Sequence, residues 1–170
     1  MFGSALPAAD QPLYAVAFRL GTLLTQAGYA VCSGGYDGTM AAVSKAARQA
    51  GGHVTGVTME GFGPRTGNPW LDEEVRTATL LHRLEHLVQR GDGFIALPGG
   101  PGTLAEIALV WALRCIAEVE KPLILIGDEW SAIVASWRDH LLTRPRDWES
   151  LEVVDTPERA VERMSTLLPA

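Results

Sequence analysis

Short apolar runs alternate with longer segments of helical periodicity along the chain. Apolar runs with the length of a strand lie at 29–32, 53–58, 93–97, 122–126 and 151–154, with a further candidate strand at 73–78. Apolar residues recur at helical spacing in 13–27, 40–47, 80–88, 103–119 and 130–142, and Thr156-Pro157-Glu158 is typical of the start of a terminal helix. Strands that are apolar throughout indicate a parallel sheet covered by helices on both faces. The sequence therefore predicts an α/β fold, a three-layer Rossmann-like domain with a mainly parallel, doubly wound sheet.

Two segments fall outside this alternation. Met1 to Ser4 looks like the tail of a strand that runs into a glycine turn, so we predict a very short first strand there. Residues 59–71 contain glycines, prolines and aromatic residues without any period. This composition is typical of a long irregular loop, a kind of segment that often serves as a lid.

The length and charge of the chain restrict its organisation and its partners. A chain of 170 residues can bury one core and is too short for two ordinary domains, so we expect one domain over residues 1–170. The formal charge of −6 argues against partners such as nucleic acid or an anionic membrane, and no apolar run is long enough to span a bilayer. Cys32 and Cys115 form no disulfide framework or CxxC motif, so a cytoplasmic location is expected.

A glycine-rich loop follows the predicted strand at 93–97. It contains Gly99, Gly100, Gly102 and Thr103, and Glu106 is expected in the first turn of the next helix. Glycines allow backbone N–H groups to approach an anion without an intervening Cβ, and the start of a helix adds a positive dipole end. The loop therefore predicts a phosphate site in a nucleotide-binding domain, with a crystal phosphate or sulfate expected on Gly99 to Thr103. A tight turn and a carboxylate that only complements the dipole are the simpler alternatives.

A second loop has the same arrangement of strand, glycine turn and helix. It contains Gly34, Gly35 and Gly38 after the predicted strand at 29–32. In a doubly wound sheet, ligands bind outside the carboxyl ends of the strands, so both loops are expected to face one cleft. Taken alone, this second loop is equally compatible with a purely structural turn.

At these residues the chain resembles the LOG proteins, cytokinin riboside 5′-monophosphate phosphoribohydrolases formerly described as lysine decarboxylases. The most specific element is the PGGxGTxxE motif, which spans Pro98 to Glu106. The resemblance extends to the Gly34-Gly35 turn and places Arg83 at the family's arginine. The sequence departs from the family where Leu84 replaces a lysine, and where a GLMG stretch reads Gly38-Thr39-Met40-Ala41.

The resemblance implies hydrolysis of the N-glycosidic bond of a nucleoside 5′-monophosphate, with a purine as the expected base. Such a bond breaks through an oxocarbenium-like sugar that a carboxylate can stabilise. Glu106 would serve the ribose and the attacking water, and Arg83 would neutralise the phosphate or the leaving group. Base contacts would come from the loops around Tyr36 and at 59–70, where no pattern identifies the base. The alternative is a non-catalytic carrier of the same fold that binds a nucleotide or the molybdenum cofactor.

No cofactor or metal ion is expected. His82 and His86 have a spacing that can bind a metal, but the pattern is not that of an HExxH motif. A pyridoxal-dependent decarboxylase needs a Schiff-base lysine, and neither Lys45 nor Lys121, the only two lysines, follows a predicted strand.

The predicted helix at 103–119 is more apolar than packing on one face of a sheet requires. LOG-like proteins are usually homodimers joined through such helices beside the active site. A two-fold homodimer is therefore expected.

Overall fold

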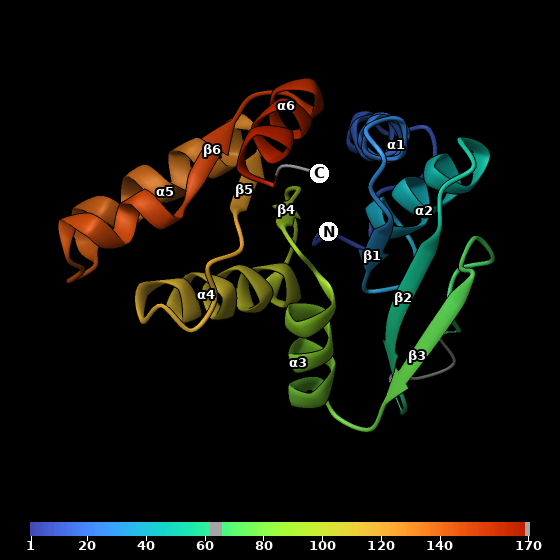
Figure 1. Cartoon of the computed structure of the whole chain (residues 1–170), viewed down its shortest axis with the longest axis horizontal. Helices are drawn as coiled ribbons and strands as arrows, with labels where there is room; N and C mark the ends of the chain where they lie inside the picture. Colours follow the sequence, from blue (N-terminus) through green and yellow to red (C-terminus); the bar gives the residue numbers. More distant parts are fainter. Residues whose placement is uncertain (62–65, 169–170) are drawn as a thin grey trace.

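The computed structural model describes residues 1–61 and 66–168 (Figure 1). The strands are β1 (Val31–Ser33), β2 (Val54–Met59), β3 (Glu73–Thr77), β4 (Phe94–Ala96), β5 (Leu123–Ile126) and β6 (Glu152–Val154). The helices are α1 (Pro12–Gln26), α2 (Thr39–Gln49), α3 (Leu80–Arg90), α4 (Pro101–Cys115), α5 (Asp128–His140) and α6 (Pro157–Leu167), with a 3-10 helix η1 (Pro145–Ser150). Each predicted strand and helix is present, with small differences at its ends.

The strands form two parallel halves with a short segment between them. One half has the order β1-β2-β3 and the other the order β4-β5-β6, and each pair within them is parallel. Phe2 forms a parallel bridge to Ala96 on β4, and the amino group of Met1 donates to the carbonyl of Cys32 on β1 at 2.6 Å. The very short first strand is thereby confirmed, and the predicted parallel, doubly wound sheet is confirmed with it.

Alternate residues of the strands pack into two apolar clusters, one on each face of the sheet. Ile95 and Ile124 lie in a cluster with buried side chains of α1, α2 and α6. Phe94 and Leu125 lie in a second cluster with buried side chains of α3, α4 and α5. The sheet is therefore the middle layer of three, which explains why its inner strands are apolar throughout.

The predicted bounds of the helix at 103–119 are wrong at both ends. The helix begins at Pro101, because a proline suits the first helical position, where its missing N–H leaves no hydrogen bond unmade. It ends at Cys115, and Ala117 has a φ of 58°, a left-handed conformation that cannot continue a right-handed helix. The earlier start matters for the site, because it changes the turn on which Glu106 lies.

The stretch between β2 and β3 is irregular, as predicted. The described residues 60–61 and 66–72 form turns and irregular backbone, and residues 62–65 of the predicted loop lie outside the described residues. In the parts of the chain that the structure describes, no helix has both the length and the apolar character needed to cross a membrane.

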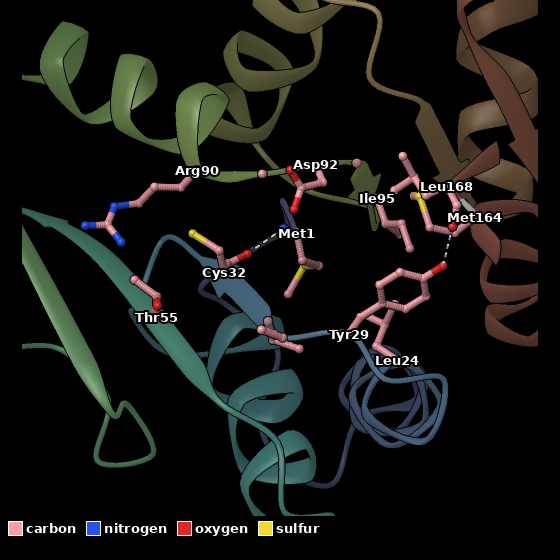
Figure 2. Close-up of a pocket in the computed structure, with 14 residues that line it drawn as sticks. Met1, Leu24, Tyr29, Cys32, Thr55, Arg90, Asp92, Ile95, Met164 and Leu168 are labelled. Carbon is pink, nitrogen blue, oxygen red and sulfur yellow. Dashed lines mark hydrogen bonds between the residues drawn. The ribbon is translucent and has the colours of Figure 1, made fainter. Parts of the chain in front are cut away.

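A cavity of about 250 Å³ lies between β1 and β4 at the amino ends of the strands (Figure 2). Met1 reaches into it from the sheet, and Tyr29, Ile95 and Met164 form apolar parts of its wall. Because the glycine-rich loops follow the carboxyl ends of the strands, this cavity lies at the opposite edge of the sheet from them. It is thus separate from the predicted site.

Candidate active site

Three loops meet where the two halves of the sheet diverge. They follow Phe2, β1 and β4, whose carboxyl ends lie side by side, and this is the position where doubly wound sheets bind ligands. A cavity of about 430 Å³ opens there. The side chains and backbone that line it are those of Gly3, Ser4, Ala5, Leu6, Tyr36, Met40, Met59, Leu80, Arg83, Gly100, Pro101, Gly102, Thr103 and Glu106.

The predicted phosphate loop contributes the start of α4 to this cavity. A Cβ built on Gly100 or Gly102 meets no atom of the described residues within 4 Å, so the space above both residues is open. Gly99 differs, since its Cβ would lie 2.2 Å from the hydroxyl oxygen of Thr103. Gly99 thus lets the loop pack on Thr103, while Gly100 and Gly102 present bare backbone to the cavity.

The structure corrects the predicted position of Glu106 on its helix. Because α4 begins at Pro101, Glu106 lies in the second turn and not in the first. A carboxylate in the second turn is too far from the free N–H groups to serve as a cap. Its side chain instead points into the molecule and is almost fully buried.

Arg83 and Glu106 form a buried ion pair in the cavity. Arg83 Nη1 donates to Glu106 Oε1 at 3.2 Å, and Arg83 Nε donates to the carbonyl of Val57 on β2 at 2.8 Å. The exposed fractions of the two residues are 9% and 6%. Burial raises the pKa of Glu106 to about 7, although the positive charges of Arg83 and of the Met1 amino group oppose this rise. A carboxyl group of this kind is poised to change its charge near neutral pH.

Helix α3 positions Arg83 through its capped start. The hydroxyl of Thr79 accepts a hydrogen bond from the N–H of His82, which holds the first turn. Arg83, Leu84 and Leu87 then form the buried face of the helix. Leu84, which the resemblance aligns with a lysine of the family, is 8% exposed and packs as an apolar side chain.

The second glycine loop packs against its neighbours and supports the arginine. A Cβ on Gly34 would lie 2.0 Å from Arg83 Nη2, so the absence of a side chain there makes room for the guanidinium. Gly35 and Gly38 have φ values of 75° and 63°, a conformation that favours glycine, and both lie close to backbone of neighbouring segments. These three glycines thus pack behind the residues that line the cavity. Their role in ligand binding stays a prediction.

Several residues that line the cavity were not among the predicted site residues. The segment from Gly3 to Leu6 forms one wall, and Met40 and Leu80 make part of the cavity apolar, together with Met59 from the 59–70 loop that was predicted to contact the base. The Gly3-Ser4 turn was the available signal for the first group. Met40 and Leu80 had no such signal, because methionine and leucine on a helix are indistinguishable from ordinary core residues in a sequence.

The two histidines considered as metal ligands, His82 and His86, lie four residues apart on α3. His82 is exposed on α3, and the described residues include no group of three or more His, Cys, Asp or Glu side chains able to hold a metal ion. Lys45 lies on α2 with its ammonium 5.5 Å from the centre of the Trp70 ring, and Lys121 bonds backbone carbonyls at the end of α3.

A family model and the relatives with similar sequences agree on one family. A family model described as "Possible lysine decarboxylase" matches residues 40–164. A cytokinin riboside 5′-monophosphate phosphoribohydrolase of Mycobacterium tuberculosis is 32% identical over 157 residues, which cover 88% of this chain and 83% of that protein. A probable enzyme of the same name from Oryza sativa subsp. japonica, LOGL5, is 37% identical over 139 residues, which cover 79% of this chain and 56% of that protein.

Two solved structures show the same fold. The X-ray structure of TM1055 matches with a TM-score of 0.77 and 29% identity, covering 96% of this chain and 95% of that one. The molybdenum cofactor carrier protein MCP from Chlamydomonas reinhardtii matches with a TM-score of 0.73 and 25% identity, covering 99% of this chain and 94% of that one.

Proposed function

Because the chain belongs to the LOG family, formerly described as possible lysine decarboxylases, we propose that it hydrolyses the N-glycosidic bond of a nucleoside 5′-monophosphate. The products are the free base and ribose 5-phosphate. The observation that carries the proposal is the buried Arg83–Glu106 pair, which shares one cavity with the open backbone of Gly100 and Gly102. The names of the relatives, phosphoribohydrolases of a nucleoside monophosphate, support the same reaction.

The cavity offers a separate environment to each part of such a substrate. The start of α4 suits the phosphate, since free N–H groups and the helix dipole favour an anion there. Glu106 lies one turn further along the same helix, where it would face the ribose. The apolar wall of Met40, Met59 and Leu80 would contact the flat face of the base.

The reaction needs stabilisation of positive charge on the sugar. As the bond between C1′ and the base nitrogen breaks, its electron pair leaves with the base and water adds to C1′. The ionised carboxylate of Glu106 would stabilise the oxocarbenium-like transition state and orient the water. The proton that the water loses neutralises the negative charge of the departing base. Arg83 would hold the carboxylate in place and would neutralise negative charge on the substrate. None of these steps uses a metal ion or an organic cofactor.

The non-catalytic carrier is the second candidate, and the similarity to the Chlamydomonas reinhardtii carrier favours it. The two candidates differ in whether a bond is broken. The deciding experiment incubates the protein with a panel of purine and pyrimidine nucleoside 5′-monophosphates and follows free base and ribose 5-phosphate. Release of both products from one of them supports the enzyme. Tight binding of a phosphorylated ligand with no release from any of them supports the carrier.

Alanine at Gly100 or Gly102 is expected to weaken phosphate binding at least tenfold without lowering stability. In the free protein the added Cβ meets no atom of the described residues within 4 Å, so the fold has no reason to change. With ligand present, the Cβ occupies the space that the phosphate needs. Titration calorimetry with ribose 5-phosphate, together with thermal unfolding, measures both effects. Unchanged affinity in both variants would place the phosphate elsewhere.

A homodimer through α3 and α4 is expected. Leu81 and Ile116 are 76% and 66% exposed, and a groove of about 600 Å³ lined by Leu84, Val88 and Leu113 runs between the two helices. Covering this apolar surface favours association. Sedimentation at micromolar concentration should give the mass of two chains, and Leu81→Arg should reduce it to one. Leu142→Arg, at a fully exposed leucine outside these two helices, should leave the dimer intact. A monomeric wild-type protein would contradict the expectation.

A further inference from the structure

A single buried amide ties the irregular segment before β3 to the second glycine loop. Asn68 is 6% exposed, and its Nδ2 donates to the carbonyls of Gly35 at 3.2 Å and Tyr36 at 3.1 Å and to the hydroxyl of Ser44 at 3.4 Å. Its own backbone N–H donates to the carbonyl of Gly35 at 2.7 Å, and its Oδ1 accepts from the N–H of Trp70. Every polar group of this side chain is thus engaged, and two of its bonds hold the backbone at Gly35 and Tyr36.

The backbone held in this way carries an aromatic ring that lies beside the arginine of the candidate site. The Cζ atom of Arg83 lies 5.7 Å from the centre of the Tyr36 ring, a distance at which a cation and an aromatic face attract each other. The hydroxyl of Tyr36 accepts from the N–H of Met59 at 2.8 Å, which fixes the far end of the ring. Tyr36 is 5% exposed and lines the cavity.

Asn68 therefore stands at one end of a chain of contacts that reaches the ion pair. Asn68 holds the backbone of Tyr36, the Tyr36 ring lies against the Arg83 guanidinium, and that guanidinium donates to Glu106 at 3.2 Å. On its other sides the guanidinium donates to the carbonyl of Val57 and lies against the backbone of Gly34. A guanidinium confined on these sides has little freedom to leave the carboxylate.

We propose that Asn68 is a positioning residue, which holds Tyr36 against Arg83 and thereby keeps the arginine opposite Glu106. The inference rests on the proposed function, because it assigns Asn68 to the pair that would perform the reaction. An amide is required at this position, since its two N–H groups donate to two backbone carbonyls. A carboxylate of the same shape would present oxygen to oxygen and push the loop away.

The matched variants are Asn68→Asp, which keeps the shape, and Asn68→Ala, which removes the hydrogen bonds without adding a charge. The control is Glu74→Gln on β3. Glu74 accepts hydrogen bonds from Thr58, from Arg76 and from the backbone of Gly67, so it anchors the residue next to Asn68, and none of these partners belongs to the second glycine loop. All three variants are expected to lower the melting temperature, because each loosens the same segment.

The measurement that distinguishes positioning from simple anchoring is the titration of Glu106. Arg83 and the Met1 amino group are the charges that lower the pKa of this carboxyl against the effect of burial. If Arg83 moves away, the pKa of Glu106 rises. Carbon-13 NMR of the labelled glutamate carboxyls, assigned with Glu106→Gln, should show this upward shift in both Asn68 variants and not in Glu74→Gln.

Activity gives the second readout. In both Asn68 variants kcat should fall about tenfold or more, with a smaller change in KM, since displacement of a catalytic group by about an ångström has effects of this size. The acid limb of the pH profile should move to higher pH. A Glu106 titration that matches the wild type in both Asn68 variants would overturn the inference. The NMR titration needs no substrate, so it can support or overturn the inference even if the wild type hydrolyses no monophosphate and the proposed function fails.

Discussion

Replacement of Glu106 by glutamine is expected to lower the turnover of a nucleoside monophosphate by about 10²-fold or more, the scale on which loss of one preorganised electrostatic group acts. Glutamine has the shape of the carboxyl group and can still accept from Arg83, so the fold and the phosphate site should remain. Only the negative charge that faces the developing sugar cation is lost. Release of free base measures turnover, and calorimetry with ribose 5-phosphate measures the phosphate site.

The pH profile provides an internal check on this variant. With a pKa of about 7, Glu106 is protonated at lower pH and ionised at higher pH, so wild-type turnover should rise as the pH increases through 7. This rise should disappear in Glu106→Gln, and Arg83→Ala should also lower turnover. Glu149→Gln, which changes an exposed carboxylate on η1, should behave as the wild type. Full activity in Glu106→Gln would contradict the proposed role.

Replacement of Gly34 by alanine is expected to reduce turnover about 10²-fold, because it displaces Arg83 without removing it. The added Cβ would lie 2.0 Å from Arg83 Nη2 and 2.7 Å from the sulfur of Met40. Both atoms are ends of flexible side chains, so the protein can fold with the alanine in place. The arginine then has to leave its position opposite Glu106, and steady-state kinetics measure the loss.

A double-mutant cycle separates this effect from general damage to the loop. In the Arg83→Ala background the guanidinium is gone and the new Cβ meets only the Met40 side chain, so Gly34→Ala should cost little further activity. Two residues in direct contact are expected to show such non-additivity, whereas independent sites add. Equal losses in both backgrounds would mean that Gly34 acts on something other than Arg83.

The glycine-rich loop at the start of α4 and the fold class could be predicted because their signals are local. A group of three glycines where a strand meets a helix can be recognised from adjacent residues alone. The apolar runs of the strands likewise indicate burial on both faces of the sheet. The start of α4 was misplaced by two residues, because Pro101 is as compatible with a turn as with a first helical position. Because of this small error, Glu106 was expected in the first turn of the helix, beside the positive end of its dipole. It lies in the second turn, where its side chain is buried.

The ion pair could not be predicted from the residues alone. Arg83 and Glu106 lie on different helices, and nothing in their spacing indicates contact. The same holds for Asn68, because the segment around it has no periodic pattern and predicts only a loop. Its partners, Gly35 and Tyr36, come from the other side of β2 in the sequence. Such contacts depend on the order of the strands, which a linear pattern does not contain.

The sequence by itself determined the alternation of strands and helices, the parallel sheet and the glycine loop at the start of α4, since each follows from periodicity or backbone freedom over a few residues. Only the tertiary structure decided that Phe2 lies between β1 and β4, which brings three loops to one cavity. It also decided that Arg83 meets Glu106 in a buried site. The physical reason is that burial and charge pairing depend on which distant segments pack together, and the free energy of that packing is shared by the whole core.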